Sequence, residues 1–352
     1  MNSPSSGSST NSDLKERWDS YLANNPRARI RDVAKVLGVT ELELLETDLG
    51  SGVTRLSCDF EPFLHGLKSL GRVMALTRND ACVIETYGNF DGIKIFDHAA
   101  QVVSPGVDLR IFPTHWAHAY AVVRDGGGRV IHSIQIFDSD GSATHKVYIP
   151  KGGDRASWEK FLDSRKHDDQ ETRTVVSNHE QVSAKEKPDG DIDEKALLAD
   201  WAELKDTHDF HFLLRKHQVT RTQALRLAEG QFTRRVTSEA GRDALIAASE
   251  TKTPLMIFVG NPGTIQIHSG SVLKTAAYKQ WYNVLDPDFN LHLKESLVDS
   301  AWVVTKPGGE LGTATSLELY SAEGESIVMI FGLRKQGADY GPAWEGIVEN
   351  LR

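Results

Sequence analysis

The sequence predicts an α+β fold built from two tandem structural repeats, each a large antiparallel β-sheet flanked by helices. Three observations predict it. The first half of the chain runs from a helix pair through two apolar segments to a three-strand meander, and the second half repeats that order at low identity. The strand-like segments alternate apolar and polar residues and turn at glycines, as antiparallel strands with one wet face do. The chain has 352 residues, which is more than one hydrophobic core usually holds.

The two repeats correspond segment by segment. Each begins with an apolar-periodic helix, a turn at Val-Thr and a second helix. Two apolar runs joined by a Gly-Asn dipeptide follow, which we interpret as a β-hairpin, and the meander comes last. The paired segments are 31–46 with 210–228 for the helices, 81–96 with 253–270 for the hairpin, and 107–149 with 289–331 for the meander.

Composition divides the chain around a connector between the repeats. The connector is charge-rich and poorly periodic, although Trp158 and Phe161 indicate one short docked helix inside it. The predicted parts are a disordered tail at 1–12, the N-terminal repeat at 13–150, a polar linker at 151–195 and the C-terminal repeat at 196–352.

Composition also excludes several classes of protein. No window approaches the ~18 uncharged apolar residues of a membrane span, and the first residues, MNSPSSGSST, lack the features of a signal peptide. We therefore expect a cytoplasmic protein without membrane insertion. A net charge of −9 argues against a nucleic-acid partner. Cys58 and Cys82 are too few for a disulfide framework or a cysteine-based zinc site, so each is expected to be a small buried side chain.

The strongest local cluster of chemically useful side chains is KDTHDFH at 205–211. Asp206 or Thr207 can cap a helix that begins here, which places His208 in the first turn. The positive end of the helix dipole disfavours an imidazolium there and keeps the ring neutral, the form that ligates iron. The alternative is that His208 and His211 are ordinary surface or partly buried helix residues.

A second candidate site lies at the start of the following helix. Thr220 and Gln223 form a predicted capping box. Arg221 opens the helix, so its guanidinium and the unbonded backbone N–H groups face one point, as in an anion site. The alternative is a solvated arginine at a helix start.

Three segments together resemble one bacterial family. They are the D-x-H-x-F motif around His208, VDLRIFPTHWAHAYAVV at 107–123 and VMIFGLRKQG at 328–337. With the internal duplication, they are similar to the haemin-degrading and haem-trafficking proteins HemS, ChuS, HmuS and PhuS over residues 13–350. The resemblance favours a ligand role for His208 over a surface role.

The resemblance implies haem b, iron protoporphyrin IX, as the cofactor. His208 matches the family's proximal iron ligand, and His211 matches an accessory histidine that some members use instead. Arg110, with Phe112 beside it against the porphyrin, matches the arginine on the opposite side of the haem and is the candidate catalytic residue. Cations that contact the propionates in the family correspond to Arg221, Lys306 and Arg334.

The function implied is that of a cytoplasmic haem-binding protein of an iron-uptake pathway, which degrades imported haem or feeds it to degradation. A non-catalytic chaperone that delivers intact haem to a separate haem oxygenase is the alternative, so enzymatic activity stays open. The partners implied are haem, a haem oxygenase or an inner-membrane haem importer, and a second copy of the chain. One departure is that Val328 and Met329 replace a polar pair of some relatives, which puts one propionate or distal hydrogen bond in doubt.

Overall fold

A computed structural model describes residues 11–177, 186–307, 312–335, 338–339 and 341–352. The chain forms two compact units, one comprising 1–75, 88–102 and 111–180, and the other comprising 76–87, 103–110 and 181–352. Most of the tail predicted at 1–12 lies outside the described residues, and the first helix begins at Asn11.

The first unit contains five helices of the described chain and a set of antiparallel strands. The helices are α1 (Asn11–Asn24), α2 (Ile30–Leu37), α3 (Glu41–Leu45), α4 (Phe60–Leu67) and α5 (Arg155–Arg165), with 3-10 turns η1 (Glu46–Asp48), η2 (Lys68–Leu70) and η3 (Pro113–His115). The strands are β1 (Val53–Leu56), β4 (Ile93–Ile95), β7 (His118–Asp125), β8 (Val130–Phe137), β9 (Ala143–Tyr148) and parts of β2 (Val73–Arg78) and β5 (Ala100–Ser104).

Four strands of the first unit pair in the order β1-β7-β8-β9, and β4 pairs with β5. Helix α3 packs on these strands because its apolar residues Leu42 and Leu45 join one cluster with Tyr120 of β7. Helix α5 is the docked helix expected inside the linker, since Trp158 and Phe161 are both buried. That prediction is confirmed.

The second unit takes strands from both halves of the chain. The first half supplies β3 (Cys82–Gly88), β6 (Val107–Ile111) up to Arg110, and parts of β2 and β5. The helices are α6 (Glu194–Ala202), α7 (Phe210–His217), α8 (Arg221–Leu227), α9 (Ala240–Thr251) and α10 (Gly341–Glu349), with 3-10 turns η4 (Asp189–Asp191), η5 (Thr207–Asp209) and η6 (Glu295–Leu297). The remaining strands are β10 (Thr233–Val236), β11 (Leu255–Asn261), β12 (Thr264–Gly270), β13 (Thr275–Tyr278), β14 (Trp281–Leu285), β15 (Phe289–Leu293), β16 (Ser300–Lys306), β17 (Ala314–Tyr320), β18 (Ser326–Gly332), β19 (Arg334–Lys335) and β20 (Ala338–Asp339).

Two antiparallel strand sets run through this unit. One has the order β10-β16-β17-β18-β11-β12-β6, and the other has the order β3-β15-β14-β13. Strand β3 pairs with β15 from Cys82 opposite Leu293 to Thr86 opposite Phe289. The predicted α+β fold, with two repeats of antiparallel sheet and flanking helices, is confirmed. Strand exchange between the halves of the chain was not predicted.

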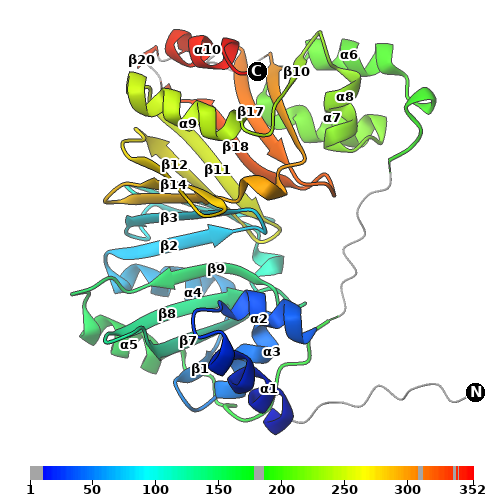
Figure 1. The fold of residues 1–352 in the computed structure, drawn as a ribbon. Coiled ribbons are helices and arrows are strands. Elements are labelled where there is room, and N and C mark those ends of the chain that lie inside the picture. The colour runs from blue at the N-terminus through cyan, green and yellow to red at the C-terminus, as the bar shows by residue number, and fades with distance from the viewer. Residues whose placement is uncertain (1–10, 178–185, 308–311, 336–337, 340) are drawn as a thin grey trace, which may run out of the picture. The chain divides into compact units, whose positions relative to one another are not determined.

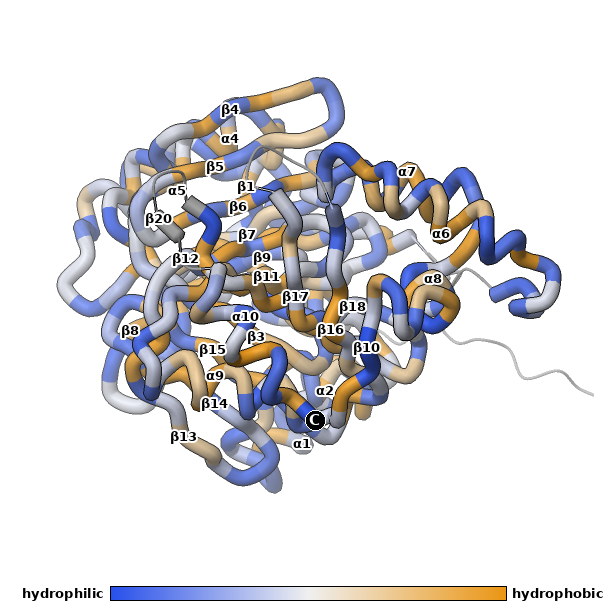
Figure 2. Tube along the Cα trace, turned by 90° about the horizontal axis from the view of Figure 1, so that it is seen from above, coloured by the Kyte–Doolittle hydropathy of each residue, from blue (hydrophilic) through white to orange (hydrophobic). Residues whose placement is uncertain are grey.

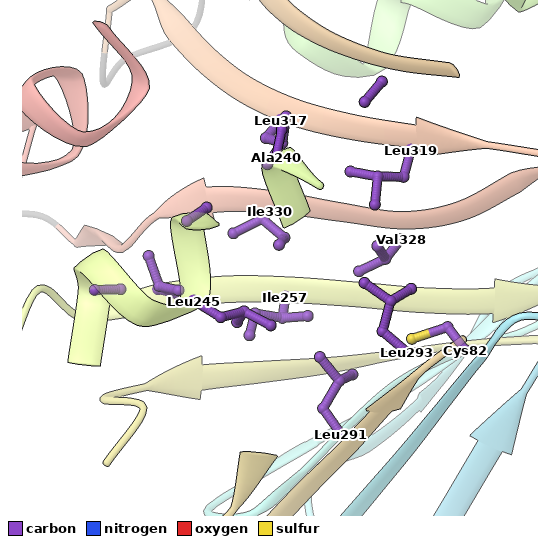
Figure 3. Close-up of a cluster of buried hydrophobic side chains, with 14 of the residues drawn as sticks. Cys82, Ala240, Leu245, Ile257, Leu291, Leu293, Leu317, Leu319, Val328 and Ile330 are labelled. Atoms are coloured by element: carbon purple, nitrogen blue, oxygen red, sulfur yellow. The ribbon is translucent and has the colours of Figure 1, made fainter. Parts of the chain in front are cut away.

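Both faces of β16, β17 and β18 are covered. Leu317 and Leu319 of β17 pack with α9 and α10 in one apolar cluster, and Figure 3 shows them pointing toward Ala240 of α9. Trp302 of β16 and Tyr320 of β17 belong to a second cluster with α6, α7 and α8, which lie together in Figure 1. Every residue of β17 is therefore buried.

One of the two predicted hairpins is wrong. Strands β11 and β12 pair as predicted, with the turn between Asn261 and Thr264. Strand β3 does not pair with β4, because β4 pairs with β5 and β3 pairs with β15. The chain leaves β3 through Phe90, which is completely buried, so the Gly-Asn dipeptide before it continues into a core rather than closing a turn.

The true counterpart of the β11–β12 turn lies between β2 and β3. Its first residue is Asn79, whose Oδ1 accepts hydrogen bonds from the backbone N–H groups of Ala81 and Cys82. Oδ1 of Asn261 likewise accepts from Gly263 and Thr264. Each asparagine also donates to the other turn: Asn79 Nδ2 lies 3.2 Å from the carbonyl oxygen of Gly260, and Asn261 Nδ2 lies 2.9 Å from that of Arg78.

Helices α6 and α7 carry hydrophobic and hydrophilic residues interspersed along their length, as Figure 2 shows. Among the described residues, no helix combines the length and the apolar composition needed to cross a membrane. Both cysteines are free; Cys82 is buried as predicted, whereas Cys58 is half-buried, with its Sγ 3.3 Å from the carbonyl oxygen of Trp116.

Candidate functional site

His208 lies in the 3-10 turn η5, directly before α7, and not in the first turn of an α-helix as predicted. The predicted cap by Asp206 is confirmed, because its Oδ1 accepts a hydrogen bond of 2.8 Å from the backbone N–H of His208. A 3-10 turn is common at a helix N-terminus. The imidazole is 92% exposed, so a large planar ligand can approach it.

The same carboxylate fixes the orientation of the ring. Nδ1 of His208 lies 2.6 Å from Oδ1 of Asp206. Hydrogen bonds from the backbone and the ring of His208 lower the pKa of Asp206, so this carboxylate is ionised and can only accept. Nδ1 therefore carries the proton, and in the neutral ring Nε2 presents its lone pair. A carboxylate that holds the far nitrogen in this way orients histidines that ligate metals.

His211 and Arg334 lie beside this histidine. Nδ1 of His211 donates to the carbonyl oxygen of His208 at 2.8 Å, which also leaves its Nε2 outside any hydrogen bond with the described residues. Nη2 of Arg334 donates to the carbonyl oxygen of Gly312 at 2.7 Å. Partial burial lowers the pKa of Arg334, and the negative charge of Asp206 opposes that shift. Two imidazoles, a carboxylate and a guanidinium therefore gather at the start of α7.

A buried ion cluster, formed by Arg221, Lys306, Glu318 and Tyr320, lies in the same unit. Oε1 of Glu318 accepts from Nζ of Lys306 at 2.6 Å, and Oε2 accepts from Nε of Arg221 at 3.0 Å and from the hydroxyl of Tyr320. The side chain of Glu318 is completely buried, that of Lys306 is 4% exposed and that of Arg221 is 26% exposed. Only Arg221 of the two cations reaches solvent to any extent.

Electrostatics keep the carboxylate of this cluster charged. Burial alone would raise the pKa of Glu318, but the adjacent Arg221 and Lys306 outweigh it and hold that pKa well below its usual range. Burial lowers the pKa of Lys306 to about 8. The negative charge of Glu318 opposes this shift, and the positive charge of Arg221 adds to it. Burial raises the pKa of Tyr320 well above its usual value. The cluster carries two cations and one carboxylate at neutral pH.

Phe210 connects the ion cluster to the histidine segment. It is the first residue of α7, and its buried ring packs edge-on against Trp201 at 4.6 Å between centroids. Nζ of Lys306 lies 4.7 Å from the ring centroid, and the guanidinium carbon of Arg221 lies 5.1 Å from it. Cations at these distances from an aromatic ring attract it.

The predicted capping box at α8 forms only in part. Thr220 Oγ1 accepts from the backbone N–H of Gln223, but the side chain of Gln223 donates to the carbonyl oxygen of Lys187 and to Asp189. Arg221 is at the start of α8 as predicted. Its guanidinium, however, binds Glu318, an internal anion, so its predicted contact with a propionate stays a prediction.

Arg110 and Phe112 take simpler positions. Nη1 of Arg110 binds the carboxylate of Asp108, which is the local pairing that a strand arginine commonly makes, and the carbonyl oxygen of Leu109. Among the described residues, no hydrogen bond or ion pair joins Arg110 to His208. Phe112 is half-buried at the end of β6, where it caps η3. The roles predicted for both residues stay predictions.

Sequence analysis singled out His208, His211, Arg221, Lys306 and Arg334, whose roles stay predictions, but not the residues that bond to them or pack against them. Those residues are Asp206 in its orienting role, Phe210, Glu318 and Tyr320. In the alternating segment SLELY, Glu318 belongs to the polar set, which lies on the wet face of an ordinary antiparallel strand; here the three helices α6, α7 and α8 cover that face. A signal was available in the two cations Arg221 and Lys306, for which the sequence analysis had named no counter-ion within the protein. The structure's described residues contain no group of three or more His, Cys, Asp or Glu side chains arranged to hold a metal ion.

The fold and this cluster define a class of α+β proteins with two repeats and an oriented, exposed histidine at the start of a C-terminal-half helix. The model of the haemin-degrading HemS.ChuX domain matches the chain twice, at residues 38–164 and 218–351. The chain therefore belongs to the HemS/ChuX family.

Individual relatives match over nearly their whole length. The hemin transport protein HemS of Yersinia enterocolitica is 33% identical over 341 residues, 96% of this chain and 97% of the relative. The crystal structure of holo-PhuS, a heme-binding protein from Pseudomonas aeruginosa, superimposes with a TM-score of 0.93 at 38% identity, covering 98% of this chain and 99% of the other. The heme degrading enzyme ChuS of Escherichia coli O157:H7 gives a TM-score of 0.89 at 30% identity, covering 97% and 99%.

Proposed function

We propose that this chain binds haem b as the ligand it handles in iron acquisition, and that Nε2 of His208 is the axial donor to the iron. One observation carries the proposal: the ring is exposed, and its Nδ1–H is held by an ionised carboxylate. That pairing fixes the tautomer and the orientation of the ring. Family membership and the names of the relatives, a hemin transport protein and a heme-binding protein, support haem as the ligand.

The remaining donors fit the edge of a porphyrin. Haem is an apolar plate with two carboxylates on one side, so it needs an apolar wall and cations at one rim. Arg334 can reach a propionate without breaking a buried ion pair, since its hydrogen bond is to a backbone carbonyl. Lys306 is almost fully buried on Glu318, so its contribution is the positive charge of the cluster. The exposed aromatic ring of Phe212 lies beside His211.

Arg110 is proposed to face the opposite side of the haem, with Phe112 beside it. A guanidinium keeps its proton, so Arg110 would act as a hydrogen-bond donor to a ligand and not as a ligand to the iron. It must exchange its bond with Asp108 for one to the bound species. In a degrading enzyme this donor would polarise oxygen species at the iron. In a carrier the same donor would hold the bound species by a hydrogen bond without promoting a reaction.

We propose haem degradation, or the feeding of haem to degradation, as the outcome of binding, in the cytoplasm. Non-catalytic delivery of intact haem to a separate oxygenase is the second candidate. The relatives include a heme-binding protein, PhuS, and a heme degrading enzyme, ChuS, so an experiment on this chain must separate the two candidates. An inner-membrane importer as the donor and a homodimer remain proposals of the same kind.

The binding test compares the effect on haem binding of replacing His208 of η5 with that of replacing His217 of α7. Titration of the purified protein with haemin should give a shifted Soret band. His208→Ala should weaken binding by on the order of 100-fold, and Asp206→Asn by ~10-fold or more, because the second loses only the orienting carboxylate. His217 is the matched control, since its Nε2 is already bound to Asp200 at 2.6 Å.

An unchanged spectrum of His208→Ala rejects the ligand assignment, unless His211 replaces it. The double variant His208→Ala, His211→Ala decides that case, because Nε2 of His211 is the nearest substitute donor. His217→Ala should leave the spectrum as in the unmodified protein.

The two candidate outcomes are separated by following the bound haem under air with a reductant, with and without catalase. Loss of the Soret band with tetrapyrrole product and released iron in both cases indicates degradation by the protein. Product formed only without catalase indicates that free peroxide does the oxidation. A stable band in both cases, with intact haem passing to an added haem oxygenase, leaves delivery as the function.

A further inference from the structure

Glu318 is the most highly bonded carboxylate of the site. Its Oε1 accepts from Nζ of Lys306 at 2.6 Å, from the hydroxyl of Ser316 at 2.9 Å and from Nη2 of Arg221 at 3.2 Å. Its Oε2 accepts from Nε of Arg221 at 3.0 Å and from the hydroxyl of Tyr320. A buried carboxylate needs this number of donors to stay charged. The three elements β16, β17 and α8 are therefore joined at one side chain.

The two cations that Glu318 holds are the same two that lie on the ring of Phe210. Without the carboxylate, Arg221 and Lys306 would repel each other in a buried site. The ammonium and the guanidinium would then leave the positions at 4.7 and 5.1 Å from the ring centroid. The start of α7 would then lose its cation–π contacts with Arg221 and Lys306 and keep only its apolar contacts.

The start of α7 also carries His208, two residues before Phe210. The turn η5 is short, and the hydrogen bonds of His208 with the described residues stay within its own segment: the ring and the backbone N–H bond to Asp206, and the carbonyl oxygen accepts from His211. Its position relative to the sheet therefore depends on the packing of α7, in which Phe210 is the buried residue nearest in sequence to His208 and contacts Trp201 and the two cations.

We propose that Glu318 is a positioning residue that, by holding Arg221 and Lys306 on the ring of Phe210, fixes the η5–α7 segment and thereby the place of His208. Glu318 does not touch the ligand in this arrangement. The haem part of this inference rests on the proposed function, whereas the positioning of the segment is a property of the protein without ligand.

The N-terminal repeat supplies a matched control. Glu46 of η1 is also a buried carboxylate, and its Oε1 accepts from Arg55 at 2.7 Å and from the hydroxyl of Tyr120 at 2.6 Å. The variants Glu318→Gln and Glu46→Gln therefore each remove one charge from a buried Arg–Glu–Tyr cluster. Tyr320→Phe, which removes only a hydroxyl donor, is the milder variant and keeps the test valid where Glu318→Gln does not fold.

The first measurement is amide hydrogen exchange of the ligand-free protein. Glu318→Gln should speed exchange of the α7 amides roughly tenfold or more relative to those of β11 and β12, which report opening of the unit as a whole. Tyr320→Phe should give a smaller change in the same direction, and Glu46→Gln should leave the ratio unchanged. Equal acceleration of α7 and of β11 and β12 would overturn the proposal, because it would show that Glu318 acts on the stability of the whole unit and not on the η5–α7 segment in particular.

The second measurement is the spectrum of the haem complex. Glu318→Gln should shift the Soret band and broaden the low-spin iron signal, since His208 samples more than one position. Glu318→Asp should restore part of the native signal because it keeps the charge. A native spectrum and dissociation rate in Glu318→Gln would overturn the proposal. If the unmodified protein binds no haem, the proposed function fails, while the exchange measurement still decides the positioning role.

Discussion

The two repeats each bury a carboxylate against an arginine and a tyrosine, but the two clusters differ in charge and in use. In the N-terminal repeat, one arginine, Arg55, balances Glu46, and the chain after α5 covers the pair through the backbone and hydroxyl of Thr174. In the C-terminal repeat, Arg221 and Lys306 share Glu318, which leaves one positive charge in excess. The surplus lies under Phe210 at the start of the helix that follows His208. On the proposal above, the Glu46 cluster serves stability alone, and the Glu318 cluster also positions His208.

The largest expected effect is on stability, and it tests the charge difference directly. Glu318→Gln leaves two buried cations without a counter-ion and should lower the free energy of unfolding by about 3–5 kcal/mol. Glu46→Gln leaves one arginine, Arg55, whose Nη1 still lies 3.7 Å from a carboxylate oxygen of Asp169, and should lower it by about 1–3 kcal/mol. Urea unfolding of both variants measures the difference. Equal losses would show that the extra cation has no energetic consequence.

That difference was outside the reach of sequence reasoning, although much else was within it. The helix pairs, the β11–β12 hairpin, the helix at Trp158 and the cap at Asp206 follow from local signals of periodicity and side-chain chemistry. The role of Glu318 depends on which helices cover the second face of β17, and the pairing of β3 with β15 joins segments far apart in the chain. Local pattern carries no information on either, so the first hairpin was assigned to the wrong strands.

The next effect concerns the buried histidines, of which each unit has one stacked on an aromatic ring. Burial lowers the pKa of His145, stacked on Trp116, to about 3 and that of His268, stacked on Phe289, to about 4. Below pH ~6.5 the unfolded ring takes up a proton that the folded ring does not, so stability falls as the pH drops toward the folded pKa. For His145 the loss between pH 6.5 and 4.5 should be ~2 kcal/mol.

Urea unfolding at pH 6.5 and 4.5 checks this window. His145→Phe keeps an aromatic ring beside Trp116 and Phe90 and should remove ~2 kcal/mol of the acid sensitivity. The corresponding His268→Phe should remove less at the same pH, because its folded pKa is higher. Acid sensitivity that persists in full in both variants would place its origin in other groups.

A smaller loss of stability is expected from replacing Asn79 or Asn261, which make equivalent hydrogen bonds in the two repeats. Asn79→Ala and Asn261→Ala each remove an acceptor for two backbone N–H groups and a donor to the other turn, and each should cost about 1–3 kcal/mol. The double variant should cost less than the sum, since the two side chains support the same pair of turns. Strict additivity in a double-mutant cycle would show that the turns are independent.

The smallest loss of stability is expected from removing the N-caps Thr40 and Thr220, which occupy equivalent places in the two helix pairs. Thr40 forms a complete capping box with Glu43, whereas Thr220 caps α8 alone and donates its hydroxyl to Glu186 at 2.7 Å. Thr40→Ala and Thr220→Ala should each lower stability by about 1 kcal/mol. The loss for Thr220 should be the larger one, because its hydroxyl makes a second bond. Thermal unfolding of the two variants, with Thr→Ser at each position as control, measures the order.

The exchange of strands between the halves of the chain has a consequence for anyone who divides this protein. The second unit contains 76–87 and 103–110, which precede the connector, and five residues of β3, Cys82–Thr86, pair with β15. A fragment that starts after the connector would expose the unpaired side of β15, a surface prone to associate with any available strand. The two halves carry complementary strands, so they should assemble by fragment complementation when they are co-expressed as two pieces. Assembly of the two pieces would then report that the native pairing of β3 with β15 has formed.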